Sequence, residues 1–170
     1  MSCLVRRRKG TSLKSFSGRL FDVVQAIAVT LWVGTLWSTG ALVAPALFRM
    51  ISDRTLAGDI AGYLFGMTAF IGLACAGCLL TVRLIHDRTD VLRQPLFWLV
   101  LSMVVLVCVS QFGIQPVLAG LREQAYPQQV MRSASAGSFA NWHAAAGILY
   151  LVQSALGLVL VALVVRAHPR

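Results

Sequence analysis

Four long apolar stretches, separated by short polar ones, dominate the pattern of hydrophobic and polar residues along the chain. They cover residues 20–48, 60–85, 95–118 and 140–165. Each is longer than the ~20 residues that an α-helix needs to cross about 30 Å of hydrocarbon. The short segments of alternating polarity that are typical of transmembrane β-strands do not occur. The pattern therefore predicts an all-α fold, an integral membrane bundle of four helices.

The composition agrees with a membrane protein and argues against a soluble enzyme. Of the 170 residues, 58% are hydrophobic and only 12% are charged, whereas soluble domains carry about 25% charged residues. The net charge of +9 does not indicate nucleic-acid binding, because the basic residues lie between the apolar stretches and not in one surface stripe. We expect a lipid-embedded domain at residues 20–166, preceded by a basic tail at residues 1–19 that is disordered or attracted to anionic headgroups.

Lysine and arginine are distributed unevenly between the two ends of the expected helices. Eleven of them lie in the N-terminal tail, the second loop and the C-terminal segment, and four lie in the first and third loops. Cytoplasmic segments of membrane proteins carry an excess of these residues. We therefore expect both termini to be cytoplasmic and the first and third loops to face outward, in a multi-pass protein of the bacterial inner (plasma) membrane.

Small residues and prolines predict where the helices pack. Gly58, Gly62 and Gly66 follow one another at four-residue steps in the second helix, a spacing that lets helix backbones approach closely. Pro45 and Pro116 lie near the outer ends of the first and third helices, where each removes a backbone donor and frees a carbonyl one turn back. These residues are expected to serve helix packing, and the glycines would alternatively form the contact of a homo-oligomer.

Polar residues gather in the half of the bundle that is expected to face outward. Gln111 and Gln115 share one face of the third helix, His143 and Tyr150 share one face of the fourth, and Asn141 lies beside them. Polar side chains at membrane depth are costly and normally face a bundle interior or a wet cavity. Two interpretations stay open: a hydrogen-bonded network between the helices, or a pocket for a small ligand. His143 is the strong ligand for a borderline metal in this group, so we expect weak metal binding there.

Several short motifs occur in a fairly specific order and spacing along the chain. They are Trp32 with Gly34, Ala44 and Pro45 with Phe48, Ala57 with Gly58, Phe65, Gln111, Ile114, Pro116, Leu121 with Arg122, and Phe139 with His143. In these motifs the chain resembles the bacterial members of the transmembrane protein 205-like domain family, over about residues 21–165. The resemblance implies a four-helix integral membrane protein of unassigned function. It also implies a distant similarity to copper-resistance D-type proteins and to the haem-containing bacterial protoporphyrinogen oxidase.

These features favour a non-enzymatic membrane protein that binds a small ligand or metal through its outer polar cluster. One alternative is a haem-dependent membrane oxidoreductase with His143 as an axial ligand, although no second histidine falls at the same depth. Another is a structural or assembly partner of a second membrane protein. No P-loop, dinucleotide-binding glycine pattern, nucleophile elbow or zinc-protease motif is present. The sequence names neither a substrate nor a cofactor.

Overall fold

The computed structural model describes residues 3–87, 91–125 and 136–167 of the chain. The described residues are helical apart from short connections, and they include no strand. Their helical segments, in chain order, are α1 (Cys3–Trp37), the π-helical turn η1 (Ser38–Val43), α2 (Ala44–Met50), α3 (Arg54–Asp87), the 3₁₀ turn η2 (Val91–Arg93), α4 (Pro95–Cys108), the π-helical turn η3 (Val109–Ile114), α5 (Gln115–Ala125) and α6 (Ala136–Ala167).

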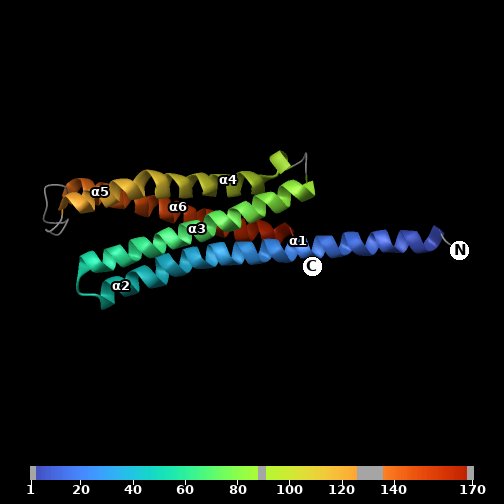
Figure 1. Cartoon of the computed structure of the whole chain (residues 1–170), viewed down its shortest axis with the longest axis horizontal. Helices are drawn as coiled ribbons and strands as arrows, with labels where there is room; N and C mark the ends of the chain where they lie inside the picture. The colour runs from blue at the N-terminus through green and yellow to red at the C-terminus, as the bar shows by residue number, and fades with distance from the viewer. Residues whose placement is uncertain (1–2, 88–90, 126–135, 168–170) are drawn as a thin grey trace.

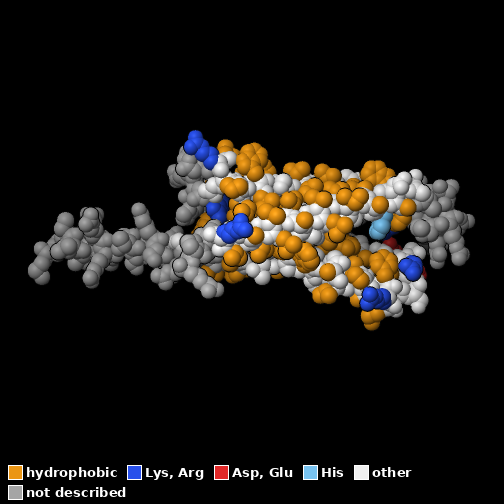
Figure 2. All heavy atoms as spheres, turned by 180° about the vertical axis from the view of Figure 1, so that it is seen from behind, with side chains coloured by type: hydrophobic (Ala, Val, Ile, Leu, Met, Phe, Trp, Pro, Cys, Tyr) orange, Lys and Arg blue, Asp and Glu red, His pale blue; other side chains and the backbone are white. Residues whose placement is uncertain are grey.

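Four helical spans of the described chain are long and apolar enough to cross a membrane. They are Leu20–Met50, Arg54–Ile85, Pro95–Glu123 and Gly137–Arg166. Each contains one of the four apolar stretches of the sequence, so the predicted fold class, a multi-pass four-helix membrane protein, is confirmed. Figure 2 shows hydrophobic side chains over the middle of the molecule and the blue Lys and Arg side chains toward its two ends.

Helix α1 begins well before the membrane span that it forms. Its first residue is Cys3, whereas the apolar span starts at Leu20. The backbone of residues 3–19 is therefore helical and continuous with the span, and Figure 1 shows it extending beyond the other helices. The sequence predicts a disordered or surface-bound tail here. Gly10 and Gly18 are the only glycines of this segment and it has no proline, so no strong helix breaker separates the basic residues from the span.

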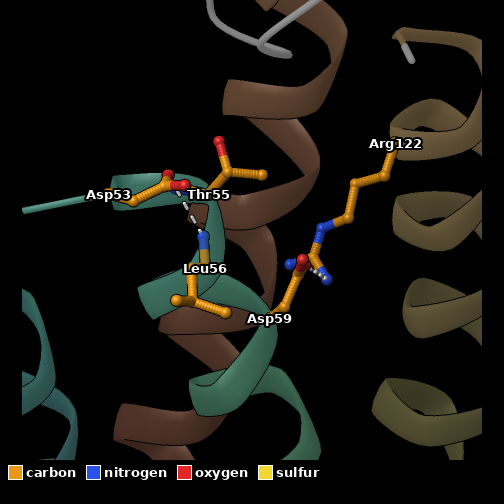
Figure 3. Close-up of polar contacts among 5 residues, drawn as sticks. All are labelled: Asp53, Thr55, Leu56, Asp59 and Arg122. Carbon is orange, nitrogen blue, oxygen red and sulfur yellow. Dashed lines mark hydrogen bonds and ion pairs between the residues drawn. The ribbon is translucent and has the colours of Figure 1, made fainter. Parts of the chain in front are cut away.

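Both described ends of the chain lie toward the same end of the bundle (Figure 1), which we call the N/C end. The opposite, far end carries the connection from α2 to α3 and the adjoining ends of α5 and α6. At this connection Asp53 caps α3, because its Oδ1 accepts the backbone N–H groups of Thr55 at 2.8 Å and Leu56 at 3.4 Å (Figure 3).

The half of the bundle toward the N/C end is closely packed. Its core consists of buried side chains from all four spans: Ala28, Val29, Trp32, Val33, Cys75, Ala76, Leu79, Leu96, Val100, Met103, Leu160 and Val164. Trp32 is 1% exposed, and its indole lies so close to Gly72 that a Cβ there would collide with it. Gly157 likewise faces Val33 and Leu36 at ordinary contact distance. Gly72 and Gly157 are therefore matched by large neighbours.

A buried polar network joins three spans in the same half. Arg83 of α3 donates hydrogen bonds of 2.9 Å to the Oε1 atoms of Gln25 on α1 and of Gln94 just before α4. Its guanidinium group also lies 5.2 Å from the ring centre of Phe21. Because Gln25 is 1% exposed, its polar oxygen needs such a partner.

Two π-helical turns widen the first and third spans. Each ends two residues before a proline, η1 before Pro45 and η3 before Pro116. Proline lacks an N–H group and its ring presses on the carbonyl of the residue four positions earlier, and a wider turn relieves both effects. Both prolines are exposed. In the structure they follow the wide turns of their own helices, and the packing role expected for them stays a prediction.

Candidate ligand-binding cavity

The far half of the bundle encloses a cavity of about 520 Å³. Residues of all four spans line it, and Figure 2 shows the molecule hollowed at this end. Cavities of about 300–1,000 Å³ are typical of small-molecule sites. The far half therefore differs from the closely packed N/C half in having room for a ligand.

The cavity forms because the helices separate into two pairs toward the far end. There α2 packs on α3, and α5 packs on α6 (Figure 1). The walls that face each other across the cavity are rich in residues with little or no side chain: Gly40, Ala41, Ala44, Gly58, Ala61, Gly62, Ala146 and Gly147. These residues supply too little volume to fill the space between the two pairs.

Four of the five side chains predicted to bind a ligand line this cavity. Gln111 and Gln115 come from η3 and the start of α5, and His143 and Tyr150 come from α6. The fifth, Asn141, is exposed and lies outside the lining. The face assignment made from helix periodicity therefore brings together the right residues on both helices.

An ion pair crosses the mouth of the cavity, and two ring contacts adjoin it on the side of α5 and α6. Arg122 of α5 extends toward α3, where its Nη1 lies 3.1 Å from Oδ1 of Asp59 (Figure 3). The same guanidinium group lies 5.7 Å from the ring centre of Phe139, and that ring stacks on His143 at 5.9 Å and 11°. Arg122 shares the predicted face of Gln111 and Gln115, whereas nothing in the sequence pattern singled out Asp59.

Tyr150 connects the two sides of the cavity. Its hydroxyl donates a hydrogen bond to the backbone carbonyl of Leu36 on α1. Its ring meets Phe65 of α3 edge-on, with centres 4.9 Å apart at 74°, and lies against Gly40, where a Cβ would be 2.5 Å from Cε1. Since its hydroxyl donor is already used within the protein, Tyr150 is a cross-link between helices and a wall of the cavity.

The glycine face of α3 also turns toward the cavity. Gly58 and Gly62 line it. The atoms nearest to a Cβ at Gly62 belong to the side chain of Arg122, at 3.6 and 3.9 Å, and the atom nearest to one at Gly66 is Nε2 of Gln111, at 3.7 Å. In the structure this face borders the cavity and polar side chains of η3 and α5, and the packing role expected for its glycines stays a prediction. Close approaches occur at Gly40 and Gly72.

Polar groups at the inner end of the cavity differ in whether they have partners. The hydroxyls of Thr39 and Thr68 lie 2.9 Å apart, and Thr68 also donates to the carbonyl of Leu64. Ser154 donates to the carbonyl of Tyr150 at 2.9 Å. By contrast, neither the Nε2 nor the Oε1 of Gln153 has a hydrogen-bond partner among the described residues, although the side chain is 3% exposed.

The family of the chain is shown by a match to a domain of unknown function, DUF4149, over residues 27–127. The chain belongs to this family. No curated protein and no solved structure matches the chain. The DUF4149 match covers the first three spans and thus three of the four walls of the cavity, but the family description names no activity.

The lining of the DUF4149 cavity contains few side chains of the types that bind metal ions tightly. Within the described parts of the chain, no group of three His, Cys, Asp or Glu side chains is placed to hold a metal. His143 is the one lining residue of these four types, and a tight zinc or copper site needs three or four good ligands. The remaining polar groups are amides and hydroxyls, which recognise hydrogen-bonding groups of small molecules.

Gln153 is a buried polar lining residue that the sequence pattern did not single out. The periodic series along the last helix passes through His143, Tyr150 and Ser154, and Gln153 lies about 80° away from His143 on an ideal helical wheel. A signal was nevertheless present, because a glutamine in the middle of an apolar span is expected to face a bundle interior.

Proposed function

We propose that this DUF4149 protein is a binding protein of the bacterial inner membrane that holds a small organic molecule in its far-half cavity and catalyses no reaction. The observation that carries the proposal is the cavity itself. Its volume of about 520 Å³ is lined by residues of all four spans, while the same spans close tightly on one another in the N/C half. The resemblance to the transmembrane protein 205-like family supports the same architecture, and we include that finer assignment in the proposal.

The proposal also places the mouth of the cavity outside the cytoplasm. The excess of Lys and Arg at the N/C end supports a cytoplasmic location for both termini. Alkaline phosphatase fused after Arg170 should therefore be inactive, whereas a fusion after Arg54, at the far end, should be active. Immunoblotting of both fusions controls for expression. High phosphatase activity at the C-terminus together with low activity at Arg54 would reverse the orientation.

A cavity-filling substitution tests ligand binding directly. Gly147 lines the cavity, and a Cβ at this position meets nothing within 4 Å, so Gly147→Phe should place a ring in the ligand space. Gly77 on α3 is exposed, is equally open and lies outside the lining, which makes Gly77→Phe a matched control.

The readout is the set of small molecules that copurify with the protein in native-membrane nanodiscs, identified by mass spectrometry after extraction. We expect a compound near one-to-one stoichiometry in the parent protein and in Gly77→Phe, and its loss in Gly147→Phe. The same bulk lipids in all three samples, with no compound that depends on Gly147, would contradict the proposal.

A further inference from the structure

The side chain of Gln153 indicates which class of ligand the cavity binds. We propose that its side-chain amide recognises the polar end of a neutral, mainly apolar molecule that enters the cavity with this end first. The recognised group is planar and carries an adjacent hydrogen-bond donor and acceptor, as in a primary amide or a protonated carboxylic acid. This inference rests on the proposed function, because it assigns a ligand class to the same cavity.

The state of the Gln153 side chain is the first argument. It lines the cavity and is 3% exposed, yet neither its donor nor its acceptor has a partner among the described residues. Buried polar groups are normally satisfied, because an unpaired one keeps the full cost of its desolvation. The terminal torsion of glutamine has a broad energy profile. The two polar atoms of Gln153 have almost no accessible surface in this structure, so rotation about this torsion is the movement that would bring them to a group in the cavity.

The neighbouring polar groups do not compete for the same role. Thr68 is bonded to Thr39 and to its own helix, and the Ser154 hydroxyl is bonded to the carbonyl one turn back. An amide offers one acceptor and an N–H donor side by side. The group that complements it places a donor opposite the amide oxygen and an acceptor opposite the amide N–H. An ester, an ether or a hydrocarbon lacks this donor–acceptor pair.

The charges around the cavity argue for a neutral ligand. Arg122 is the charged residue in the lining, and it is already paired with Asp59 at 3.1 Å. The other polar groups at the inner end are neutral hydroxyls, and the lining there also includes apolar side chains such as Leu106 and Val107. An ionised group placed among them would be desolvated without compensation.

The shape of the cavity supports an apolar body behind the polar end. Ten residues of α6 separate His143 at the mouth from Gln153, which corresponds to about 15 Å of helix. Phe65, Leu118 and Leu149 line the wall. A ligand that reaches Gln153 therefore places its apolar body along this wall.

Two brominated probes that differ only in the polar end test the inference, since bromine quenches tryptophan fluorescence. 2-Bromododecanamide carries a donor and an acceptor, and methyl 2-bromododecanoate carries acceptors only. Trp32 and Trp37 line the cavity, whereas Trp98 and Trp142 lie outside it. The parent for this experiment is the full chain with Trp98→Phe and Trp142→Phe, reconstituted in lipid nanodiscs.

We expect saturable quenching, with the amide bound about tenfold more tightly than the ester, a difference of about 1.4 kcal/mol. In Gln153→Leu, and in Gln153→Met as a second variant of similar length, the two probes should bind equally. Ser154→Ala is the matched control, because it removes a neighbouring hydroxyl that is already bonded within α6, and it should keep the tenfold preference.

The outcomes separate this inference from the proposed function. Equal binding of amide and ester to the parent, or a preference that survives in both Gln153 variants, overturns the role of Gln153 and leaves a cavity that binds apolar molecules. Quenching that never saturates with either probe overturns the proposed function together with the inference.

Discussion

In the N/C half Val100, Met103 and Leu160 have no exposed surface, whereas in the far half the same four spans surround a cavity of about 520 Å³. Both halves are rich in small residues, and the difference lies in what stands opposite them. Gly72 faces the Trp32 indole, while a Cβ at Gly58 or Gly147 would meet nothing within 4 Å. In membranes small residues promote helix contact only when a partner fills the groove that they leave, and otherwise they create space.

The two halves also treat buried glutamines differently. The Oε1 of Gln25 accepts a hydrogen bond from Arg83 in the N/C half. Gln153, at the boundary with the far half, has no partner for either polar atom within the described chain. Since both side chains are at least nine-tenths buried, depth does not explain the contrast. The Nε2 of Gln25 also has no partner among the described residues, so the contrast concerns the oxygen and the surroundings: Gln153 has no partner at either polar atom and lines a cavity, which makes it the candidate for binding.

The largest expected effect comes from removing a leucine side chain in each half of α6. Leu160→Ala should lower the free energy of unfolding by about 2–5 kcal/mol, toward the lower end because lipid also solvates leucine in the unfolded state. Leu149 lines the cavity and is half-buried. Leu149→Ala should cost less than half as much, because its open side has no contacts to lose.

Unfolding in mixed detergent micelles, followed by circular dichroism, measures both values. Leu158→Ala, at an exposed position of the same helix, controls for the change in helix propensity. Equal losses for Leu160→Ala and Leu149→Ala would mean that the far half is as closely packed as the N/C half in solution.

Glycine-to-alanine substitutions test the same difference in packing between the two halves, with smaller expected losses of stability. Gly72→Ala forces a Cβ against the indole of Trp32, which is 1% exposed and packed in the core of the N/C half, so it should destabilise the protein by about 1–3 kcal/mol. Gly40→Ala forces a Cβ against the Tyr150 ring, which borders the cavity and can shift into it. We therefore expect a loss that is smaller by at least half.

Gly77→Ala is the control for both glycine variants, because a Cβ at this exposed position meets nothing within 4 Å. It should be neutral or stabilising by up to about 1 kcal/mol through the lower backbone entropy of alanine. The stabilities of the three variants are compared by their melting temperatures, measured in the same detergent. A greater loss at Gly40 than at Gly72 would show that Tyr150 is held rigidly and that the cavity wall does not yield.

Hydropathy predicted the four spans because length and apolar content decide membrane crossing. The structure extends every span at the far end, where Arg54 and Arg122 continue helices beyond the apolar stretch. Local hydrogen bonding, such as the Asp53 cap, sets that boundary, and a hydropathy window does not detect it. The prolines signalled a disturbed helix, but not that the disturbance takes the form of a π-helical turn on each of two spans.

The sequence predicted which site residues share a face of the third and of the fourth helix, but it did not predict that these faces border a cavity. Periodicity grouped Gln111 with Gln115 and His143 with Tyr150, and these side chains do line one cavity. It did not distinguish a face that packs from one that borders space, because this depends on the residue across the gap. For the same reason it did not show that the Tyr150 hydroxyl is bonded to α1.

The smallest expected effect concerns the ion pair between Asp59 and Arg122, the polar link between α3 and α5 at the mouth. Their side chains are 54% and 30% exposed, so the coupling should be only about 0.2–1 kcal/mol and should decrease as salt is added. A double-mutant cycle of Asp59→Asn and Arg122→Gln isolates it from the contact of Arg122 with Phe139. The cycle of Asp59→Asn with Arg54→Gln, an exposed arginine at the same end, should give no coupling. A coupling above about 2 kcal/mol would show that the mouth is closed and desolvated, and the far half would then resemble the N/C half more than its cavity suggests.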